Sequence, residues 1–462
     1  MTESAETAPK LRGSQYLGYA AGEVANNLTF QMVSVFLLIY YTDVAGISAS
    51  TAGTLLLVVR IWGGFTDLLA GRRVDRTTTR WGRFRPYLPF GSVPLLILLV
   101  VTFSIPQSLG SNLALVWALI SYALFSLAYS FVNIPYGSLG AAMTQQPHER
   151  AKLSSARSVS ASVTILLIAV VVSPQVQGSG DLQRSLTLTT GIFAAIGLAL
   201  YLWCFATSRE AVRPETEQVD ARQTVQMIRQ NRPLVLLCAS TLLFLTGMFS
   251  LSAVAVFYAR DVLGNADYYI AMTAVQTLTM VAAAAAVPAA VRRAGKKRAY
   301  VASGAIVAVA AVGFALAPGS VPALGIACYG VLGLGFGAIN ALIFALQADT
   351  VEYGEWKSGV RAEGASYSVL SFTRKAGQGI GGAAAAYTIG LGGYISGAAD
   401  QTGGAVASIR IAAGIVPAIA VAGATAAMLA YPLTEKAFRA IVAELAQRRA
   451  ARPVSAPAVA PV

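Results

Sequence analysis

The chain contains little charge. Only 12% of its 462 residues are Asp, Glu, Lys or Arg, whereas soluble domains carry about 25%. This scarcity excludes an ordinary soluble domain, and the 56% hydrophobic content indicates an integral membrane protein. The formal net charge of +13 does not indicate nucleic-acid binding, because the basic residues lie in short loops between apolar segments. The lipid bilayer is therefore the expected partner.

Residues that bind metals or attack substrates are also scarce. The cysteines, Cys204, Cys238 and Cys328, all fall within apolar segments, as small core residues do. The one histidine, His148, lies in a loop, and we find no metal-ligand spacing, activated nucleophile or phosphate-binding loop. We therefore expect no metal, no cofactor and no enzymatic activity. The polar N-terminal segment lacks a basic n-region, so the first apolar segment should be a membrane helix rather than a signal peptide.

Twelve apolar segments of membrane-spanning length follow one another along the chain. They lie at 16–41, 48–71, 86–106, 111–140, 153–175, 186–207, 233–259, 267–291, 299–317, 322–349, 365–394 and 407–431. We predict an all-α membrane protein with twelve transmembrane helices in two six-helix halves, 16–207 and 233–431. The polar run 208–232 is the predicted linker. The tails are 1–15 and 432–462, with disorder expected over 443–462.

Basic residues predict the orientation of these segments. The loop after the second segment, called here the arginine loop, carries Arg72, Arg73, Arg76, Arg80, Arg83 and Arg85. The loop after the eighth segment carries Arg292, Arg293, Lys296, Lys297 and Arg298, whereas the loops after the third and ninth segments carry no charge. Even-numbered loops and both termini are therefore predicted to be cytoplasmic. Six plus six segments around a cytoplasmic linker outline a major facilitator transporter, with its substrate site near the bilayer midplane between the halves.

Asp67 is the most informative polar residue within an apolar segment. On a helix it shares one face with Arg60, Gly63, Gly64 and Gly71. A carboxylate in an apolar segment is energetically expensive and usually binds something. We predict that Asp67 takes up a proton or helps to bind a cation. The alternative is an ion pair with an arginine that only locks helices together.

Three further segments place polar residues on one face or at a break in the helix. These residues are Tyr19, Glu23, Asn26, Asn27 and Phe30 in the first segment, Ser130 and Asn133 before Pro135 in the fourth, and Tyr367, Ser371, Arg374, Lys375 and Gln378 in the eleventh. They are expected to line a cavity or to bond between helices. Helical spacing does not choose between Arg374 and Lys375 as the cation that pairs with Asp67, Glu23 or a bound substrate.

A run of charges follows the tenth segment and is expected near the cytoplasmic surface. It consists of Asp349, Glu352, Glu355, Lys357, Arg361 and Glu363. One interpretation is that these residues pair with the arginine loop and hold an inner gate shut. The other is ordinary solvated charge.

Five motifs in order carry a family resemblance. They are YYTDVAGIS at 40–48, D-x-x-x-G-x-x-x-D-R-T at 67–77, WGRFRPY at 81–87, NIPYGSL at 133–139 and ADTVEYGEWKSGVRAEG at 348–364. With them the chain resembles the glycoside–pentoside–hexuronide:cation symporters, a branch of the major facilitator fold, from about residue 16 to residue 444. Segments such as SFTRKAGQGIGG are most similar to the glucuronide carriers. The resemblance implies a monomer in the bacterial inner membrane that takes up a sugar or sugar acid with H⁺, Na⁺ or lithium by alternating access.

The resemblance assigns the cation residue. In the melibiose carriers of this family two acids of the second helix hold the cation. Asp67 matches the second acid, but Gly63 stands where the first should be. Sodium prefers several oxygen ligands, much as harder divalent cations do, while one carboxylate suffices for a proton. The departure favours H⁺ over Na⁺.

The resemblance also assigns the substrate residues. Asn27 and Asn133 replace two acids that bind neutral sugars in the melibiose carriers, which lowers the repulsion of a hexuronide carboxylate. Arg157 and Lys375 match basic positions where a carboxylate can bind. Gly137 occupies the place of an aromatic platform, so sugar stacking must differ or a bulkier aglycone fits there.

These observations predict a cation-coupled symporter for a glucuronide or related glycoside. Asp67 is predicted to couple the cation, and Asn27, Asn133, Arg157 and Lys375 to bind the substrate. Possible partners are Glu23, Asn26, Arg60, Ser130, Tyr367, Ser371 and Arg374. The alternatives are a proton-linked exporter, a carrier of another small organic anion, or a non-transporting sensor.

Overall fold

The structure is a computed structural model that describes residues 11–144, 146–178, 180–211, 230–358, 363–398 and 400–450. Helices dominate these ranges, and the labels η mark π-helical turns. The first group is α1 (Gly13–Gln31), η1 (Met32–Phe36), α2 (Leu37–Ile39), η2 (Tyr40–Val44), α3 (Ala49–Asp75), α4 (Tyr87–Thr102), α5 (Ser111–Met143), α6 (Pro147–Gly178) and α7 (Leu182–Thr207). The second group is α9 (Arg232–Phe257), η3 (Tyr258–Val262), α10 (Tyr268–Ala294), α11 (Lys296–Leu316), α12 (Pro322–Ser358), α13 (Glu363–Leu391), α14 (Gly403–Arg410), η4 (Ile411–Ile415), α15 (Val416–Leu429) and α16 (Glu435–Ala450).

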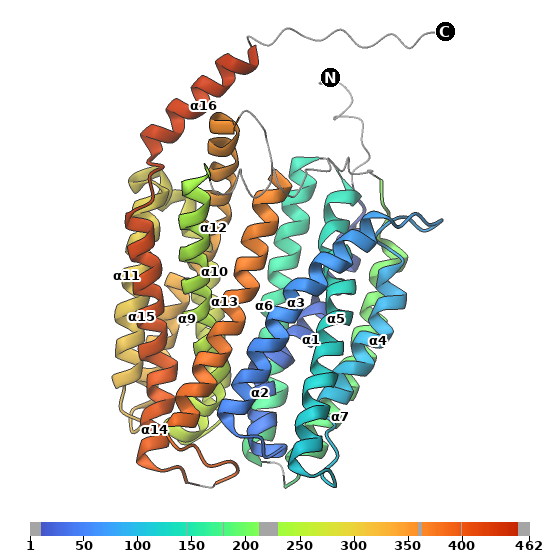
Figure 1. Cartoon of the computed structure of the whole chain (residues 1–462), viewed down its shortest axis with the longest axis vertical. Coiled ribbons are helices and arrows are strands. Elements are labelled where there is room, and N and C mark those ends of the chain that lie inside the picture. Colours follow the sequence, from blue (N-terminus) through green and yellow to red (C-terminus); the bar gives the residue numbers. More distant parts are fainter. Residues whose placement is uncertain are drawn as a thin grey trace.

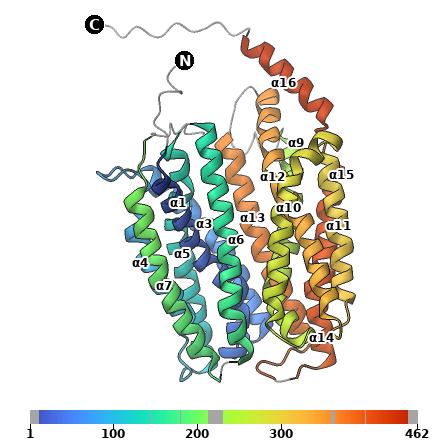
Figure 2. The ribbon, with the colours of Figure 1, turned by 180° about the vertical axis from the view of Figure 1, so that it is seen from behind.

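The two groups of helices stand side by side. In Figure 1, α1 to α7 occupy one side of the molecule and α9 to α15 the other, with their long axes nearly parallel. Helices α3 and α13 pack against each other across the seam, and α6 and α10 do so as well. Figure 2 shows the second of these contacts from behind. The described residues contain no ladder of strands, only an isolated bridge between Thr79 and Gly82. The all-α prediction is confirmed.

Ten helical rods of the described chain are long and apolar enough to cross a membrane. Helix α4 is shorter, at 16 residues, and α13 is not among the ten. Every predicted apolar segment nevertheless overlaps one of the observed helices or a continuous run of them, such as Gly13–Val44 and Gly403–Leu429. The count of twelve transmembrane helices and the cytoplasmic position of the termini stay predictions.

Local sequence explains where several helices begin. The side chains of Ser48, Asp181, Asn231 and Thr402 each accept a hydrogen bond from a backbone N–H in the first turn of the following helix. Such caps satisfy backbone donors that have no partner within the helix, and each contributes about 1 kcal/mol. In α9, Pro233 follows the cap in the first turn, where its missing N–H is not needed.

Each group contains a tight glycine turn that an acid holds from the end of another helix. In the first group, Glu210 accepts hydrogen bonds from the backbone N–H groups of Arg83, Phe84 and Arg85 at 2.8, 2.8 and 2.9 Å. In the second group, Glu435 accepts one from the N–H of Lys296 at 3.3 Å. The preceding residues are glycines with positive φ in both cases, Gly82 at 108° and Gly295 at 80°. The two halves thus repeat the same contact at the same end of the bundle.

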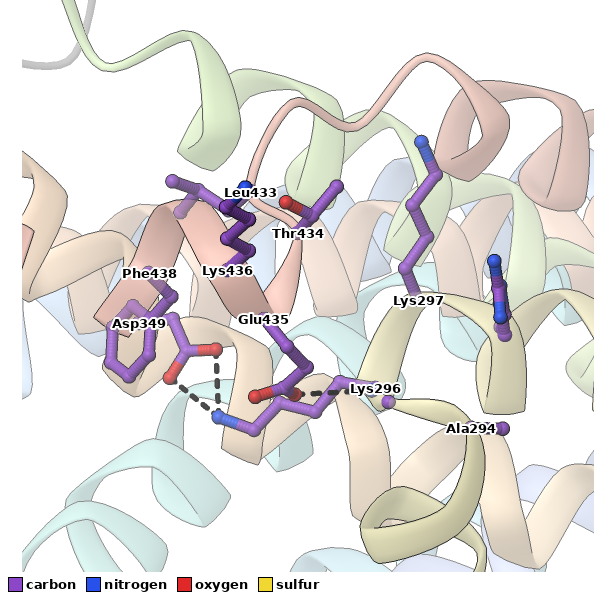
Figure 3. A pocket seen from close by; sticks show the side chains of 11 residues that line it. Ala294, Lys296, Lys297, Asp349, Leu433, Thr434, Glu435, Lys436 and Phe438 are labelled. Carbon is purple, nitrogen blue, oxygen red and sulfur yellow. Dashed lines mark hydrogen bonds and ion pairs between the residues drawn. The ribbon is translucent and has the colours of Figure 1, made fainter. Parts of the chain in front are cut away.

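Asp349, the first residue of the charged run after the tenth predicted segment, neither pairs with the arginine loop nor lies in solvent. Asp349 is buried, and its two carboxylate oxygens both accept hydrogen bonds from Lys296 Nζ at 2.7 Å (Figure 3). Lys296 belongs to the same group of helices, so in this structure Asp349 pairs within its own half and not with the arginine loop. Burial explains the outcome, because a carboxylate out of water needs the nearest available cation. Arg361 lies outside the described residues, as does the Glu363 side chain.

The segments predicted to be linker and tail are only partly described. Residues 212–229 of the linker lie outside the described chain. In the C-terminal tail, α16 continues through Ala450, so the disorder expected from residue 443 does not begin there. An ion pair between Glu444 and Arg448, one turn apart, supports this helix. Residues 451–462 lie outside the described chain.

The two groups are joined at the end of the bundle opposite the arginine loop. Arg260 of η3 contacts Asp43 of η2 at 2.6 Å and Asp261 at 2.7 Å. Tyr394 donates to both oxygens of Asp43 at 2.9 and 3.0 Å. We call Asp43, Arg260, Asp261 and Tyr394 the outer cluster.

A second contact between the groups lies at the same end. Ser173 of α6 donates to the carbonyl oxygen of Ala266, which precedes α10, at 2.5 Å. Gln177 accepts from the N–H of Ala266 at 2.6 Å. Together with the outer cluster, these bonds close the seam between the groups at this end.

Candidate substrate and cation site

Asp67 points into the seam between α3 and α13. Its carboxylate forms an ion pair with Lys375, whose Nζ also donates to the carbonyl oxygen of Gly63 at 3.2 Å. The Asp67 side chain is 16% exposed, whereas Phe65 and Leu68 on the same helix are 54% and 55% exposed. Helix α3 therefore presents an apolar face outward and its acid inward. Asp67 Oδ1 is buried and accepts no hydrogen bond in the described part of the chain.

Arg60 lies two turns before Asp67 and binds polar groups from both halves. It donates to Ser34 Oγ of η1 at 2.9 Å and to Gln378 Oε1 of α13 at 3.3 Å. Its guanidinium also lies over the ring of Phe30, 5.1 Å from the centroid, a cation–π contact. In this structure Arg60 does not pair with Asp67. The cation that pairs with Asp67 is Lys375.

A second buried charge lies within the first group. Glu23 of α1 accepts a hydrogen bond from Arg157 Nε of α6 at 2.6 Å. Its other carboxylate oxygen accepts from Asn27 Nδ2 at 3.0 Å. The Glu23 side chain is 9% exposed and the Arg157 side chain 37% exposed. Arg157 also lies 5.4 Å above the ring of Tyr136. Within this pair Glu23 is therefore shielded from solvent, whereas Arg157 is accessible to it.

The amides of α1 and α5 form a network beside this pair. Asn26 Nδ2 donates to Asn133 Oδ1 at 3.0 Å and to the Tyr129 hydroxyl at 3.1 Å. The hydroxyl of Tyr201, from α7, donates to Asn26 Oδ1 at 3.4 Å. Asn26 and Tyr201 are fully enclosed, while Asn133 is half-buried. Asn133 is thus the amide of this network that a solute can reach most directly.

Aromatic rings connect the network to the Asp67–Lys375 pair. Tyr129 stacks on Phe30, with 5.8 Å between the ring centroids, and Phe30 carries the guanidinium of Arg60. Below it, Ser130 of α5 shares a 2.8 Å hydrogen bond with Thr66 of α3. A cavity of about 40 Å³ lies at this junction. Its lining includes Phe30, Arg60, Tyr129 and Lys375.

Three predicted residues of α13 do not join this site. Arg374 points the other way, toward α12, where it lies over Phe344 and donates to Asn340 at 3.4 Å. The Tyr367 side chain is 54% exposed, and Ser371 is half-buried. Adjacent residues on a helix point about 100° apart, so only one of Arg374 and Lys375 can face the seam.

The structure also adds residues that the sequence analysis did not single out. Tyr129 and Tyr201 complete the amide network, and Thr66 holds Ser130. Tyr129 had a signal, since it stands four residues before Asn133 on one helical face. Thr66 had none, because a lone Thr hydroxyl in an apolar helix usually bonds to its own backbone. Tyr201 had none either, because a tyrosine in an apolar helix is usually a core aromatic residue. The outer cluster was also missed, although Asp43 lies within one of the five motifs.

Two groups of apolar helices with buried charges along their seam define a polytopic membrane transporter. The fold agrees with this class. The structure is similar to the crystal structure of the nucleoside transporter NupG, with a TM-score of 0.65 at 12% sequence identity, covering 91% of this chain and 100% of that chain. Residues 18–435 match the family described as MFS/sugar transport protein, and the chain belongs to this family.

Relatives of known sequence support the same assignment. The chain is 41% identical to the "Glucuronide carrier protein homolog" of Escherichia coli (strain K12), over 94% of this chain and 95% of that protein. It is 31% identical to the "Putative 2,3-dihydroxypropane-1-sulfonate exporter" of Salmonella typhimurium, over 97% of this chain and 99% of that protein. The predictions of a major facilitator fold, of a multi-pass inner-membrane transporter and of no enzymatic role are confirmed.

Proposed function

We propose that the chain is a secondary active symporter that imports a sugar or sugar acid, such as a glucuronide or related glycoside, together with a proton. Asp67 is the proposed proton site. Lys375, Arg157, Asn133 and Asn27 are the proposed substrate residues. Membership of a sugar-transport family and the name of the E. coli relative support the substrate class.

One observation carries the coupling role of Asp67: its second carboxylate oxygen is buried without a hydrogen-bond partner in the described chain. An unsatisfied buried acceptor costs roughly 1–3 kcal/mol, and functional sites are where such groups persist. A proton on this oxygen would neutralise the acid and weaken its hold on Lys375. Because the two residues belong to different halves, the loss of their attraction would free the seam.

The charge of the site favours an anionic substrate over a neutral one. Lys375 pairs with Asp67, Glu23 with Arg157, and Arg60 remains as a cation whose described contacts are uncharged groups and a ring. The amides Asn27 and Asn133 add hydrogen-bonding capacity without negative charge. A carboxylate entering this region would therefore meet surplus positive charge, while hydroxyls could bond to the amides.

The first test is gradient-driven uptake by Asp67→Asn. An asparagine has the size of aspartate but cannot exchange a proton at neutral pH. We expect Asp67→Asn to abolish accumulation of a labelled glucuronide in membrane vesicles with an imposed proton gradient, while exchange between equal concentrations on both sides persists. Full accumulation by the variant would remove Asp67 from the coupling mechanism. If uptake depended on sodium rather than on the proton gradient, the coupled cation would be Na⁺ and the proposed coupling to a proton would be wrong.

A proton-linked exporter is the second candidate, because one relative carries the name of a sulfonate exporter. The same site chemistry would serve efflux of a small organic anion. Cells that express the chain separate the two directions. Uptake that alkalinises the medium identifies an importer, whereas resistance to loading together with faster loss of preloaded anion identifies an exporter.

A further inference from the structure

We propose that Glu23 occupies the place at Arg157 that the carboxylate of the transported sugar acid takes when it binds. Glu23 pairs with Arg157 in the empty carrier, and it takes up a proton when the substrate's carboxylate replaces it. Glu23 would thereby set the preference for anionic over neutral substrates. This inference rests on the proposed function, since it concerns how the same site recognises its solute.

The geometry of the pair leaves room for a second carboxylate. Glu23 engages Arg157 through Nε only, at 2.6 Å. The guanidinium also interacts with the Tyr19 hydroxyl, and its two terminal amino groups carry further N–H donors that can donate to a bidentate carboxylate. The Arg157 side chain is also 37% exposed, four times as open as Glu23 at 9%. An incoming anion therefore meets the base before the acid.

Charge balance then links the substrate to a proton. Glu23 and Arg157 together carry no net charge while the carrier is empty. A carboxylate bound at Arg157 would leave one uncompensated negative charge at this pair, because the surplus cation Arg60 lies beyond Tyr129 and is held by Ser34, Gln378 and the ring of Phe30. An unpaired buried charge is strongly unfavourable. One proton on Glu23 restores neutrality. The proton comes from solvent, the Arg157–Glu23 ion pair breaks, and an ion pair between Arg157 and the substrate forms in its place.

The neighbours of Glu23 allow this exchange. Asn27 donates to one of its oxygens at 3.0 Å, and an amide can also accept from a protonated carboxyl group after a flip. The other titratable and charged groups that face Glu23 or share its surroundings are Tyr19 of α1, Tyr129 and Tyr136 of α5, Arg157 of α6, Tyr201 and Cys204 of α7, and, beyond Tyr129, Arg60 and Asp67 of α3. The tyrosines, the cysteine and the arginines keep their charge state near neutral pH, so Glu23 and Asp67 are the groups that can exchange protons.

A matched pair of ligands separates Glu23 from Asp67. The probes are p-nitrophenyl glucuronide and p-nitrophenyl glucoside, which differ only in the carboxylate, and the readout is the ratio of their dissociation constants on purified protein. Asp67 affects both ligands, so its contribution cancels in the ratio. In the wild type we expect the glucuronide to lose up to about tenfold in relative affinity per pH unit above neutrality, because its binding takes up one proton.

The decisive variant is Glu23→Gln, which keeps the hydrogen bonds of the side chain but cannot exchange a proton. Its ratio should become independent of pH to within about twofold, and its glucuronide affinity should rise about tenfold at alkaline pH, because Arg157 is no longer neutralised. Glu23→Asp should restore the pH dependence. Glu444→Gln, at an exposed Glu–Arg pair of α16, is the control and should behave as the wild type.

Three results would overturn the inference. The first is a ratio in Glu23→Gln that follows the wild-type pH dependence. The second is an equal loss of affinity for both ligands in that variant, which would make Glu23 structural. The third needs no variant: glucuronide binding to the wild type in weak buffer that takes up no more protons than glucoside binding. If the wild type binds neither ligand, the proposed substrate class fails, and this inference fails with it.

Discussion

Arg374 and Lys375 show that the direction in which a side chain points decides which of two adjacent cations pairs with Asp67. Both are cations inside one apolar helix, and on sequence spacing Arg374 aligns better with the polar face. The structure turns Lys375 to Asp67 and Arg374 to Asn340 and Phe344. Asp67 itself could be predicted, because an acid in an apolar segment is rare. Its partner could not, since that depends on how α13 is rotated against α3.

A double-mutant cycle tests this pairing. Asp67→Asn and Lys375→Met each leave one buried charge unpaired and should each destabilise the protein by about 3 kcal/mol. The double variant removes both charges and should be more stable than either single variant. Arg374→Met is the matched control, and its effect should add to that of Asp67→Asn without coupling. Thermal unfolding in detergent measures the wild type, the three single variants and the double variants of Asp67→Asn with Lys375→Met and with Arg374→Met. Equal coupling of Asp67 to both cations would contradict the pairing.

At the scale of elements, apolar segments and charged loops predicted the helices to within a few residues at most ends. The exceptions have a common physical cause. Helix α12 continues past its apolar part to Ser358, and α16 forms within the polar tail. Polar residues continue or form a helix where neighbouring elements supply partners, as Trp356 does by donating to Glu444 at 2.7 Å. Hydropathy alone does not contain that information.

The acid-held glycine turn gives a prediction for one of these elements. A Cβ at Gly82 would lie 2.5 Å from the Glu210 carboxylate, on a backbone with φ of 108°. Gly82→Ala should therefore destabilise the protein by about 1–3 kcal/mol. Gly71→Ala is the control, because a Cβ there meets nothing within 4 Å on a helical backbone, and alanine should be neutral or stabilising by about 0.5–1 kcal/mol. The melting temperatures of the two variants in detergent are compared with that of the wild type. An unchanged melting temperature in Gly82→Ala would show that the turn tolerates a side chain.

At the scale of the whole molecule, the outer cluster closes one end of the seam. With the orientation predicted from the basic loops, this end faces the outside of the cell, so the conformation is closed to the outside. The sequence places an acid near one segment end, an arginine and an acid near a second and a tyrosine near a third, and it gives no reason to bring them together. Only the packing of the two halves does so.

Removing the cation of this cluster should shift the conformation. Arg260→Gln leaves Asp43 and Asp261 facing each other without a cation, and breaking such a buried pair costs about 3–5 kcal/mol. We expect spin labels at Gln107 and Ser320, in loops of opposite halves at this end, to move apart in a background without native cysteines. Arg410→Gln is the control, since Arg410 contacts carbonyl oxygens of its own half at 3.1 and 2.5 Å. An unchanged distance distribution in Arg260→Gln would show that the cluster does not hold the halves together.

The division of the site between the halves has a mechanical consequence. Glu23, Asn26, Asn133 and Arg157 all lie in the first group of helices, whereas Asp67 and Lys375 face each other across the boundary. If the proposed roles hold, most of the substrate residues move with one half, while Lys375 connects the substrate to the proposed proton site Asp67 at the boundary. Variants of Asn133 and Arg157 should then change which solutes are carried, and variants of Asp67 should change whether carrying them consumes a gradient.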